Sequence, residues 1–271
     1  MKGLWEILQY EFMRNALAAG IMASVACGVV GALVVTRRIS MISGGISHAA
    51  FGGIGLGFYL KFNPILGALI FTIISALGLG VIKEKTRISE DSAIGILWVT
   101  GMSLGIILIS LTPGYAPNLF SYLFGSILTV PRSDLIAMLI LDIAILLVTY
   151  MFYERFLAVS FDEDYAEASG IPVQYTYLTL LLLVALTVVI LIRIVGVILI
   201  IAMLTIPATI AWQFSYKLKQ IMIISFILSV IFTIEGLWLS YMLNLPSGAT
   251  IVLVSVATLI LSSVLKRALR K

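Results

Sequence analysis

Residues 37–53 of this chain read RRISMISGGISHAAFGG, and residues 54–60 continue as IGLGFYL, so together they form an apolar segment long enough to cross a lipid bilayer. This segment carries His48, the only histidine of the chain, next to Ser47 and among many glycines. A polar side chain that can bind metal is costly at membrane depth, so such a residue is a candidate functional position. We therefore expect the rest of the chain to hold His48 beside a path across the membrane.

The composition indicates an all-α polytopic membrane protein. Of the 271 residues, 61% are hydrophobic and only 11% are charged, and several apolar runs reach the ~20 residues that a spanning helix needs. A transmembrane β-barrel would instead show short segments of alternating polarity. The net charge of +4 needs no nucleic-acid partner, because Lys and Arg accumulate in the cytoplasmic loops of membrane proteins. The single cysteine, Cys27, excludes an intrachain disulfide and is expected to be a small buried hydrophobe.

The apolar runs predict one transmembrane domain over residues 1–271, with about nine spanning helices and eight as the alternative count. A helix at the membrane interface is expected over 4–14, and the apolar stretch 119–130 is too short to span. The nine expected spans are 16–36, 39–60, 65–82, 93–111, 135–152, 175–192, 195–213, 221–243 and 248–264.

The distribution of basic residues predicts the orientation. With these spans, one set of loops holds 12 Lys and Arg residues and the other holds 5, and the richer side is expected to be cytoplasmic. The C-terminus is then inside and, with nine spans, the N-terminus is outside. The 12 are Arg37, Arg38, Lys83, Lys85, Arg87, Arg155, Lys217, Lys219, Lys266, Arg267, Arg270 and Lys271, and the 5 are Lys2, Arg14, Lys61, Arg132 and Arg193.

His48 has two interpretations from its chemistry alone. Imidazole suits zinc and other transition metals, but a histidine can also serve only as a hydrogen-bonding group between helices. One histidine makes a poor metal site, although two copies meeting at a two-fold axis would bring two imidazoles together. The glycines around it either allow close helix packing, which we favour, or permit an unwound turn that exposes carbonyl groups. They are Gly44, Gly45, Gly52, Gly53, Gly55 and Gly57.

Two carboxylates also lie inside apolar spans, Glu235 and Asp142. A buried carboxylate must find a partner, accept a proton or contact a cation. Glu235 is expected either to pair with Arg193 or to belong to a transport path, and Asp142 is a weaker candidate for such a path.

The longest polar stretch, 154–174, contains the acidic run DEDYAEASGIP at 162–172. Asp162 and Ser160 are expected to cap a short helix that ends near Ala168, with Gly170 as its stop. An acidic run departs from the positive-inside trend and indicates a docking site for a protein partner. The chain has no Gly-x-x-x-x-Gly-Lys-[Ser/Thr] motif, so it is not expected to be a P-loop ATPase itself.

Taken together, these stretches resemble the membrane permease subunit of bacterial and archaeal ABC importers for divalent metals, the zinc/manganese family. The resemblance covers nearly the whole chain. The matching stretches are ACGVVG at 26–31, LVVTRR at 33–38, SHA at 47–49, YLFGSIL at 122–128, FDEDYA at 161–166, GIP at 170–172 and PSGATIVL at 246–253.

The resemblance implies a fold like that of type II ABC importer permeases in the inner (plasma) membrane. Two copies of the chain would pair with two cytoplasmic ABC ATPases, and an extracytoplasmic metal-binding protein would deliver zinc or manganese. The chain itself would be no enzyme and would hold no permanent cofactor. His48 falls on the family's path-lining histidine, and Glu235, Ser47, backbone carbonyls or the second chain's His48 would complete the metal shell. The residues expected to couple to the ATPase are Phe161, Asp162, Glu163, Tyr165, Ala166 and Gly170.

The chain departs from the family pattern at three positions. Many members have aspartate where Gly44 and Asn244 stand here, and some have it in place of Ser126. The usual contribution of hard oxygen ligands is therefore in doubt, and the residues do not decide between zinc and manganese. Two rival functions stay open: an importer of metal chelates or cobalamin-like compounds, and a secondary carrier or channel that needs no ATPase.

Overall fold

The computed structural model describes residues 9–113, 125 and 127–269, and nine helices of at least 19 residues lie within these ranges. Each of the nine expected spans coincides with one of them. They are α2 (Glu11–Thr36), α3 (Ser40–Tyr59), α4 (Pro64–Lys85), α5 (Glu90–Ser110), α7 (Arg132–Met151), α10 (Val173–Ile194), α11 (Gly196–Phe214), α12 (Leu218–Leu243) and α13 (Ser247–Leu269).

Eight of these nine helices are long and apolar enough to cross a membrane. The exception is α3, which carries His48. Its glycines, serines and histidine lower its apolarity. The neighbouring helices cover it instead, since every residue from Ile42 to Ser47 and from Ala49 to Gly55 is buried. A helix that is enclosed by protein does not need an apolar surface of its own.

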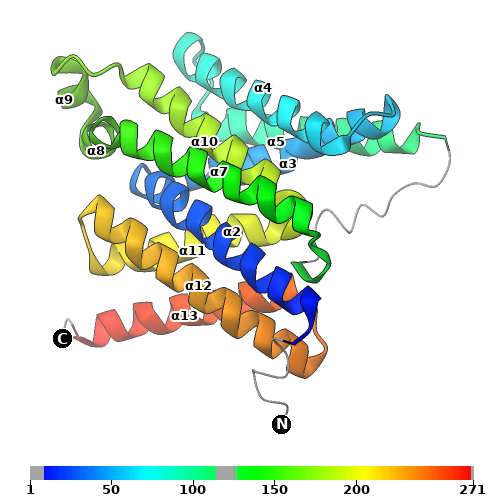
Figure 1. The fold of residues 1–271 in the computed structure, drawn as a ribbon. Helices are drawn as coiled ribbons and strands as arrows, with labels where there is room; N and C mark the ends of the chain where they lie inside the picture. The colour runs from blue at the N-terminus through cyan, green and yellow to red at the C-terminus, as the bar shows by residue number, and fades with distance from the viewer. Residues whose placement is uncertain (1–8, 114–124, 126, 270–271) are drawn as a thin grey trace.

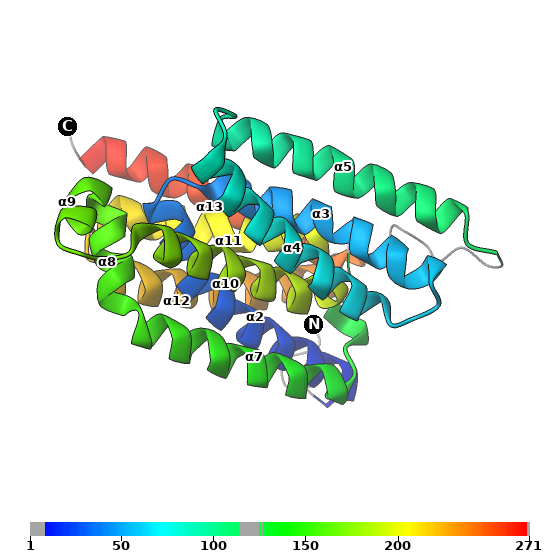
Figure 2. The same ribbon diagram turned by 90° about the horizontal axis from the view of Figure 1, so that it is seen from above.

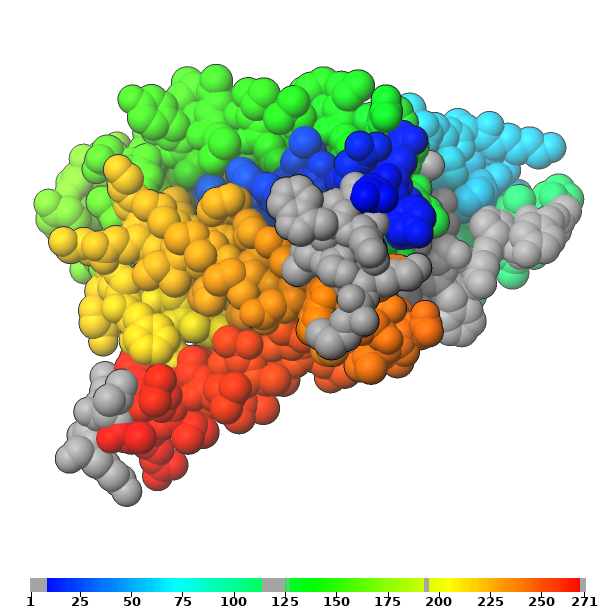
Figure 3. Space-filling view, turned by 60° about the horizontal axis from the view of Figure 1, so that its bottom comes forward, coloured from blue at the N-terminus to red at the C-terminus, as the bar shows by residue number. Residues whose placement is uncertain are grey.

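The helices form one bundle in which α2 is central (Figure 1). Figure 2 shows α5 and α7 on opposite sides, with α2 and α10 between them. Helix α3 packs against α5, α4, α10 and α11, whereas α12 packs mainly against α2, α11 and α13. The space-filling view shows α12 at the surface between α7 and α13 (Figure 3).

The glycines of α3 allow close packing, and α3 is a continuous helix through His48. A Cβ atom added at Gly53 would collide with the backbone of Gly67 in α4, and one added at Gly55 would lie 2.6 Å from the carbonyl oxygen of Gly105 in α5. Backbones this close exclude any side chain at the crossing. The packing interpretation is thus confirmed, and the alternative of an unwound turn is wrong for this structure.

The expected polar loop 154–174 contains two short helices, α8 (Tyr153–Phe161) and α9 (Glu163–Ala168). They lie at the same end of the bundle as the C-terminus and the α11–α12 connection (Figure 1). We call this end the α9 end.

Two other predictions concern segments that lie partly outside the described residues. The expected interfacial helix at 4–14 falls partly outside the described residues, and its last part is the first turn of α2, which begins at Glu11. Most of 119–130 is likewise outside them, and its described part includes the short 3₁₀ helix η1 (Ile127–Thr129).

Candidate functional site

The imidazole of His48 lies flat against the indole of Trp98, which belongs to α5. The two ring centroids are 4.0 Å apart and the rings are inclined by only 9°. The indole N–H of Trp98 donates to the sulfur of Met102, one turn further along α5, at 3.3 Å. The stacking therefore fixes the plane of the imidazole from a neighbouring helix, and the Met102 contact fixes the indole.

The Nδ1 atom of His48 is buried and has no hydrogen-bond partner among the described residues. A buried imidazole nitrogen without a partner is unusual, because most buried polar atoms are paired. Across the described part of the chain there is no cluster of three or more His, Cys, Asp and Glu residues that would hold a metal ion. Within the described residues, His48 therefore does not belong to a group of three such side chains.

The other predicted residues of α3 lie close to His48 in sequence but differ in their surroundings. The Ser47 hydroxyl is fully buried and donates to the carbonyl oxygen of Ser43 at 2.6 Å. A Cβ atom added at Gly44 would lie 3.6 Å from Trp98 and 3.7 Å from Ile201, which is ordinary van der Waals contact. Position 44, one helical turn before His48, therefore has room for a Cβ atom.

Glu235 lies on α12 and is exposed in the single chain. The helix α12 is not among those that pack extensively against α3, so one chain does not bring Glu235 and His48 together. The expected pairing with Arg193 falls on a side chain outside the described ones. The next residue, Gly236, lies against α13, where an added Cβ would be 2.7 Å from the Cα of Ile251.

The two remaining departures from the family pattern are Asn244 and Ser126. Asn244 ends α12 in the left-handed conformation with φ 52°, which asparagine tolerates better than most residues. A carboxylate there would face the negative end of the helix dipole, so asparagine suits this cap better than aspartate. Ser126 lies outside the described residues.

Asp142 and Cys27 are neighbours in the interior of the bundle. Asp142 on α7 is 6% exposed, and Cys27 on α2 is 1% exposed and lies within its electrostatic reach. The expectation that Cys27 is a small buried hydrophobe is confirmed. Neither residue belongs to the surroundings of His48 described above.

The segment 161–170 is organised as a capped turn of helix. The Asp162 carboxylate accepts from the backbone N–H of Tyr165 at 3.0 Å, so Asp162 is the N-cap of α9 as predicted. Gly170 follows the helix with φ 78°, as expected for a stop. Ser160 is not a cap: it lies inside α8, and its buried hydroxyl oxygen has no partner among the described residues.

Side chains of this segment point in two directions. Phe161 and Tyr165 are 68% and 67% exposed, whereas Ala166 is fully buried against the bundle. Glu163 forms an ion pair with Arg37, in the link between α2 and α3. The Arg37 side chain is only 4% exposed and that of Glu163 is 46% exposed, so α9 is tied inward to the helix connection that leads to His48.

Further charged contacts join this ion pair to three more helices. The ammonium of Lys83 in α4 lies 3.9 Å from both Glu163 and Glu90, and Tyr177 of α10 donates to Glu90 of α5 at 2.5 Å. Burial lowers the pKa of the Arg37 guanidinium from its ordinary value, because desolvation disfavours the charged form. Glu163 supplies the counter-charge of this guanidinium.

Sequence reasoning missed Trp98 and Arg37 as parts of this arrangement. No spacing in the sequence relates Trp98 to His48, so only the packing of α5 on α3 reveals the ring contact. A partial signal existed for Arg37, since an acidic run stands inside the loops that are richest in basic residues. The opposite charges of Arg37 and Glu163, both expected on the cytoplasmic side, would have justified predicting an ion pair between them.

The chain is similar to known proteins over almost its full length. A family profile described as "ABC 3 transport family" matches residues 9–266. The chain is 46% identical to an uncharacterised membrane protein of Synechocystis, over 98% of this chain and 95% of that protein. It is 37% identical to the manganese transport system membrane protein MntC of Listeria monocytogenes, over 92% of this chain and 89% of that one.

A solved structure also resembles this chain over nearly its full length. The structure described as PsaBC from Streptococcus pneumoniae in complex with Fab superposes with a TM-score of 0.85 at 34% identity. The match covers 96% of this chain and 93% of that chain. The helical architecture described above is thus that of an experimentally solved relative.

Proposed function

The chain belongs to the ABC 3 transport family, as its motifs predicted, and from this premise we propose that it is the permease subunit of an ATP-driven importer of a divalent transition metal. The observation that carries this proposal is the match to the manganese permease MntC of Listeria over nearly all of both chains. A second copy of the chain, two cytoplasmic ABC ATPases and an extracytoplasmic metal-binding protein would complete the transporter. The protein would lie in the inner (plasma) membrane, with its C-terminus and α9 facing the cytoplasm.

We propose that His48 lines the metal path. Three observations support this: the enclosed position of α3, the partnerless Nδ1 atom, and the stacking on Trp98 that holds the ring in place. Because the described residues of one chain form no three-ligand group at the imidazole, a second chain would contribute its own His48 or Glu235. Glu235 is exposed in the single chain and is therefore available to a second copy. Ser47 and backbone carbonyls remain proposed ligands.

The metal is proposed to be manganese or zinc. The names of two relatives, from Listeria monocytogenes and Streptococcus gordonii, favour manganese. The residues themselves do not decide between the two ions: Gly44 supplies no carboxylate one turn before His48, and imidazole suits zinc and other transition metals. Uptake of both ions must therefore be measured.

We propose that the two faces of segment 161–170 have different tasks. The exposed Phe161 and Tyr165 would contact the ATPase, together with the capped turn between Asp162 and Gly170. Ala166 faces the bundle, and Glu163 would pass the movement of α9 to the α2–α3 link through Arg37. This division assigns Glu163 to the transmission of force and not to direct docking.

The test is metal accumulation in cells that express the permease with its ATPase. We expect accumulation of manganese or zinc that is lost when the ATPase is inactivated by replacing its phosphate-binding lysine. Uptake of a metal chelate or a cobalamin-like compound that free metal does not compete with would favour the first rival function. Uptake that persists without an active ATPase would favour the secondary carrier and contradict the proposal.

A further inference from the structure

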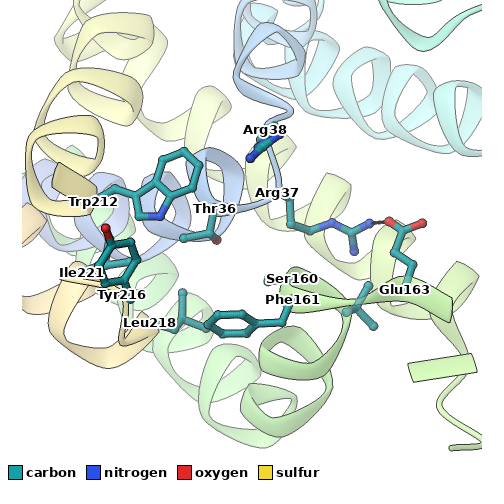
Figure 4. Close-up of a pocket in the computed structure, with 11 residues that line it drawn as sticks. Thr36, Arg37, Arg38, Ser160, Phe161, Glu163, Trp212, Tyr216, Leu218 and Ile221 are labelled. Carbon is teal, nitrogen blue, oxygen red and sulfur yellow. Dashed lines mark hydrogen bonds and ion pairs between the residues drawn. The ribbon is translucent and has the colours of Figure 1, made fainter. Parts of the chain in front are cut away.

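A cavity of about 470 Å³ opens at the α9 end of the bundle (Figure 4). It lies between the α2–α3 link, the end of α8, the end of α11 and the start of α12. Arg37 and Arg38 line it from the link, and Ser160 lines it from α8. Trp212 and Tyr216 line it from the α11 side. The roles proposed above use Arg37, Phe161 and Glu163 at its edge, but they assign no ligand to the cavity itself.

Two residues that line the cavity, Arg37 and Ser160, each carry a buried hydrogen-bonding atom without a partner among the described residues. The Nη1 atom of Arg37 is buried and has no partner among the described residues, although its Nη2 atom binds Glu163. The hydroxyl oxygen of Ser160 is also buried and without a partner in the described part of the chain. The Arg37 side chain is only 4% exposed, so bulk water reaches it poorly. Buried charged donors of this kind are normally paired.

The charges around the cavity leave an excess of positive charge. Arg38 lies over the Trp212 ring, 6.0 Å from its centroid, so its guanidinium stands at the same cavity (Figure 4). Glu163 is the acidic residue that lines the cavity, and both Arg37 and Lys83 neutralise it. With Glu163 already compensated, the cavity has a cationic wall and at least two donors that lack an acceptor.

We propose that this cavity binds the phosphate group of an anionic ligand between Arg37, Arg38 and Ser160. A tetrahedral phosphate offers acceptors in several directions, which suits donors that come from both the α2–α3 link and α8. A carboxylate fits less well, because Arg37 already has one in Glu163. Trp212 and Tyr216 are residue types that concentrate at the membrane interface, so the phosphate can belong to a phospholipid headgroup or be free in solution.

The test uses the purified permease–ATPase complex, with ligand binding followed by native mass spectrometry and by thermal unfolding. The probes are phosphatidylglycerol, diacylglycerol as the tail-matched lipid without phosphate, and inorganic phosphate. The variants are Ser160→Ala and Arg38→Gln, and their matched controls are Ser169→Ala and Arg267→Gln, which are exposed residues outside the cavity.

We expect phosphatidylglycerol to bind and diacylglycerol not to bind, and each cavity variant to weaken the apparent affinity about tenfold, while the controls leave it unchanged. Loss of one charge-assisted hydrogen bond has an effect of that order. Binding of phosphatidylglycerol alone identifies a headgroup site, and competition by inorganic phosphate identifies a site for free phosphate; both support the proposal.

Equal binding by cavity and control variants would overturn the proposal, as would the absence of binding by either phosphate probe. A structure of the complex with an ATPase side chain seated between Arg37 and Ser160 would also overturn it. The readout is binding and not transport, so its outcome is independent of whether the chain imports metal. Ser160→Ala changes only a hydroxyl in α8 and keeps the test decisive if the Arg38 variant does not fold.

Discussion

Replacing Glu163 with glutamine removes the negative partner of a guanidinium that is almost fully buried. Arg37 would keep its charge inside the bundle but would lose the carboxylate that pairs with it, and Lys83 would lose the same contact. The Arg37 side chain is 4% exposed and that of Glu163 is 46% exposed. The pair thus lies between a surface ion pair, worth about 0–1 kcal/mol, and a buried one, whose disruption costs about 3–5 kcal/mol.

We take about 2 kcal/mol as the free energy by which the pair holds α9 to the α2–α3 link. At about 1.4 kcal/mol per factor of ten, this shifts the equilibrium between the joined and separated arrangements by roughly 30-fold. Glu163→Gln should therefore leave ATP hydrolysis largely intact while metal uptake per ATP falls by up to that factor. Binding of the ATPase should persist, because Glu163 faces Arg37 rather than the solvent side of α9.

The assay is reconstitution of permease and ATPase in proteoliposomes, with uptake of radioactive metal and release of phosphate measured on the same sample. The matched control is Glu167→Gln, which removes an exposed carboxylate from the same helix. The charge-reversed double variant Arg37→Glu with Glu163→Arg should recover a large part of the uptake that either reversal alone loses. Such recovery measures the coupling between the two side chains directly.

Two results would refute this reasoning. Glu163→Gln and Glu167→Gln could lower uptake equally, which would show that any charge on α9 has the same effect. Alternatively, the double reversal could be no better than the single ones. In either case the ion pair would be a structural contact of the folded chain and not the link between ATPase and metal path.

Three further outcomes are expected. Gly53→Leu should lower the unfolding temperature in detergent, because a side chain at Gly53 collides with α4 at a cost of about 1–3 kcal/mol or more, whereas Gly78→Leu should not, since nothing lies within 4 Å of a Cβ there. Gly44→Asp should fold and raise the ratio of manganese to zinc uptake, because a Cβ atom fits at position 44 and a carboxylate favours the harder ion; an unchanged ratio would separate position 44 from the path. Trp98→Ala should raise the KM for metal, since His48 loses a stack worth about 0.5–1.5 kcal/mol, and Trp98→Phe should restore it; equal KM values would contradict a positioning role.

Much of the fold followed from local sequence signals. The spans are apolar runs bounded by charge or by turn residues, and each became one helix. The α9 boundaries followed from capping chemistry, with Asp162 before the helix and Gly170 after it. The family was recognisable because several motifs occur in one order along the chain.

The parts that escaped sequence reasoning depend on contacts between distant residues. Arg37 and Glu163 are 126 positions apart, and nothing local distinguishes Glu163, which contacts Arg37, from the other acidic residues of α9. Ser160 looked like a capping residue because of its type, but α8 continues past it and buries its hydroxyl. Glu235 looked like a residue of a buried span, yet it sits on a face of α12 that the single chain leaves open.

The central claim is that His48 borders a metal path that an ATPase drives, and proteoliposomes that contain permease and ATPase test it most directly. Inward transport of manganese and zinc should depend on ATP in the unchanged protein. In the His48→Ala variant it should fall at least tenfold, although the complex assembles and unfolds at a similar temperature. Undiminished ATP-dependent transport by this variant would contradict the account and remove the imidazole from the path.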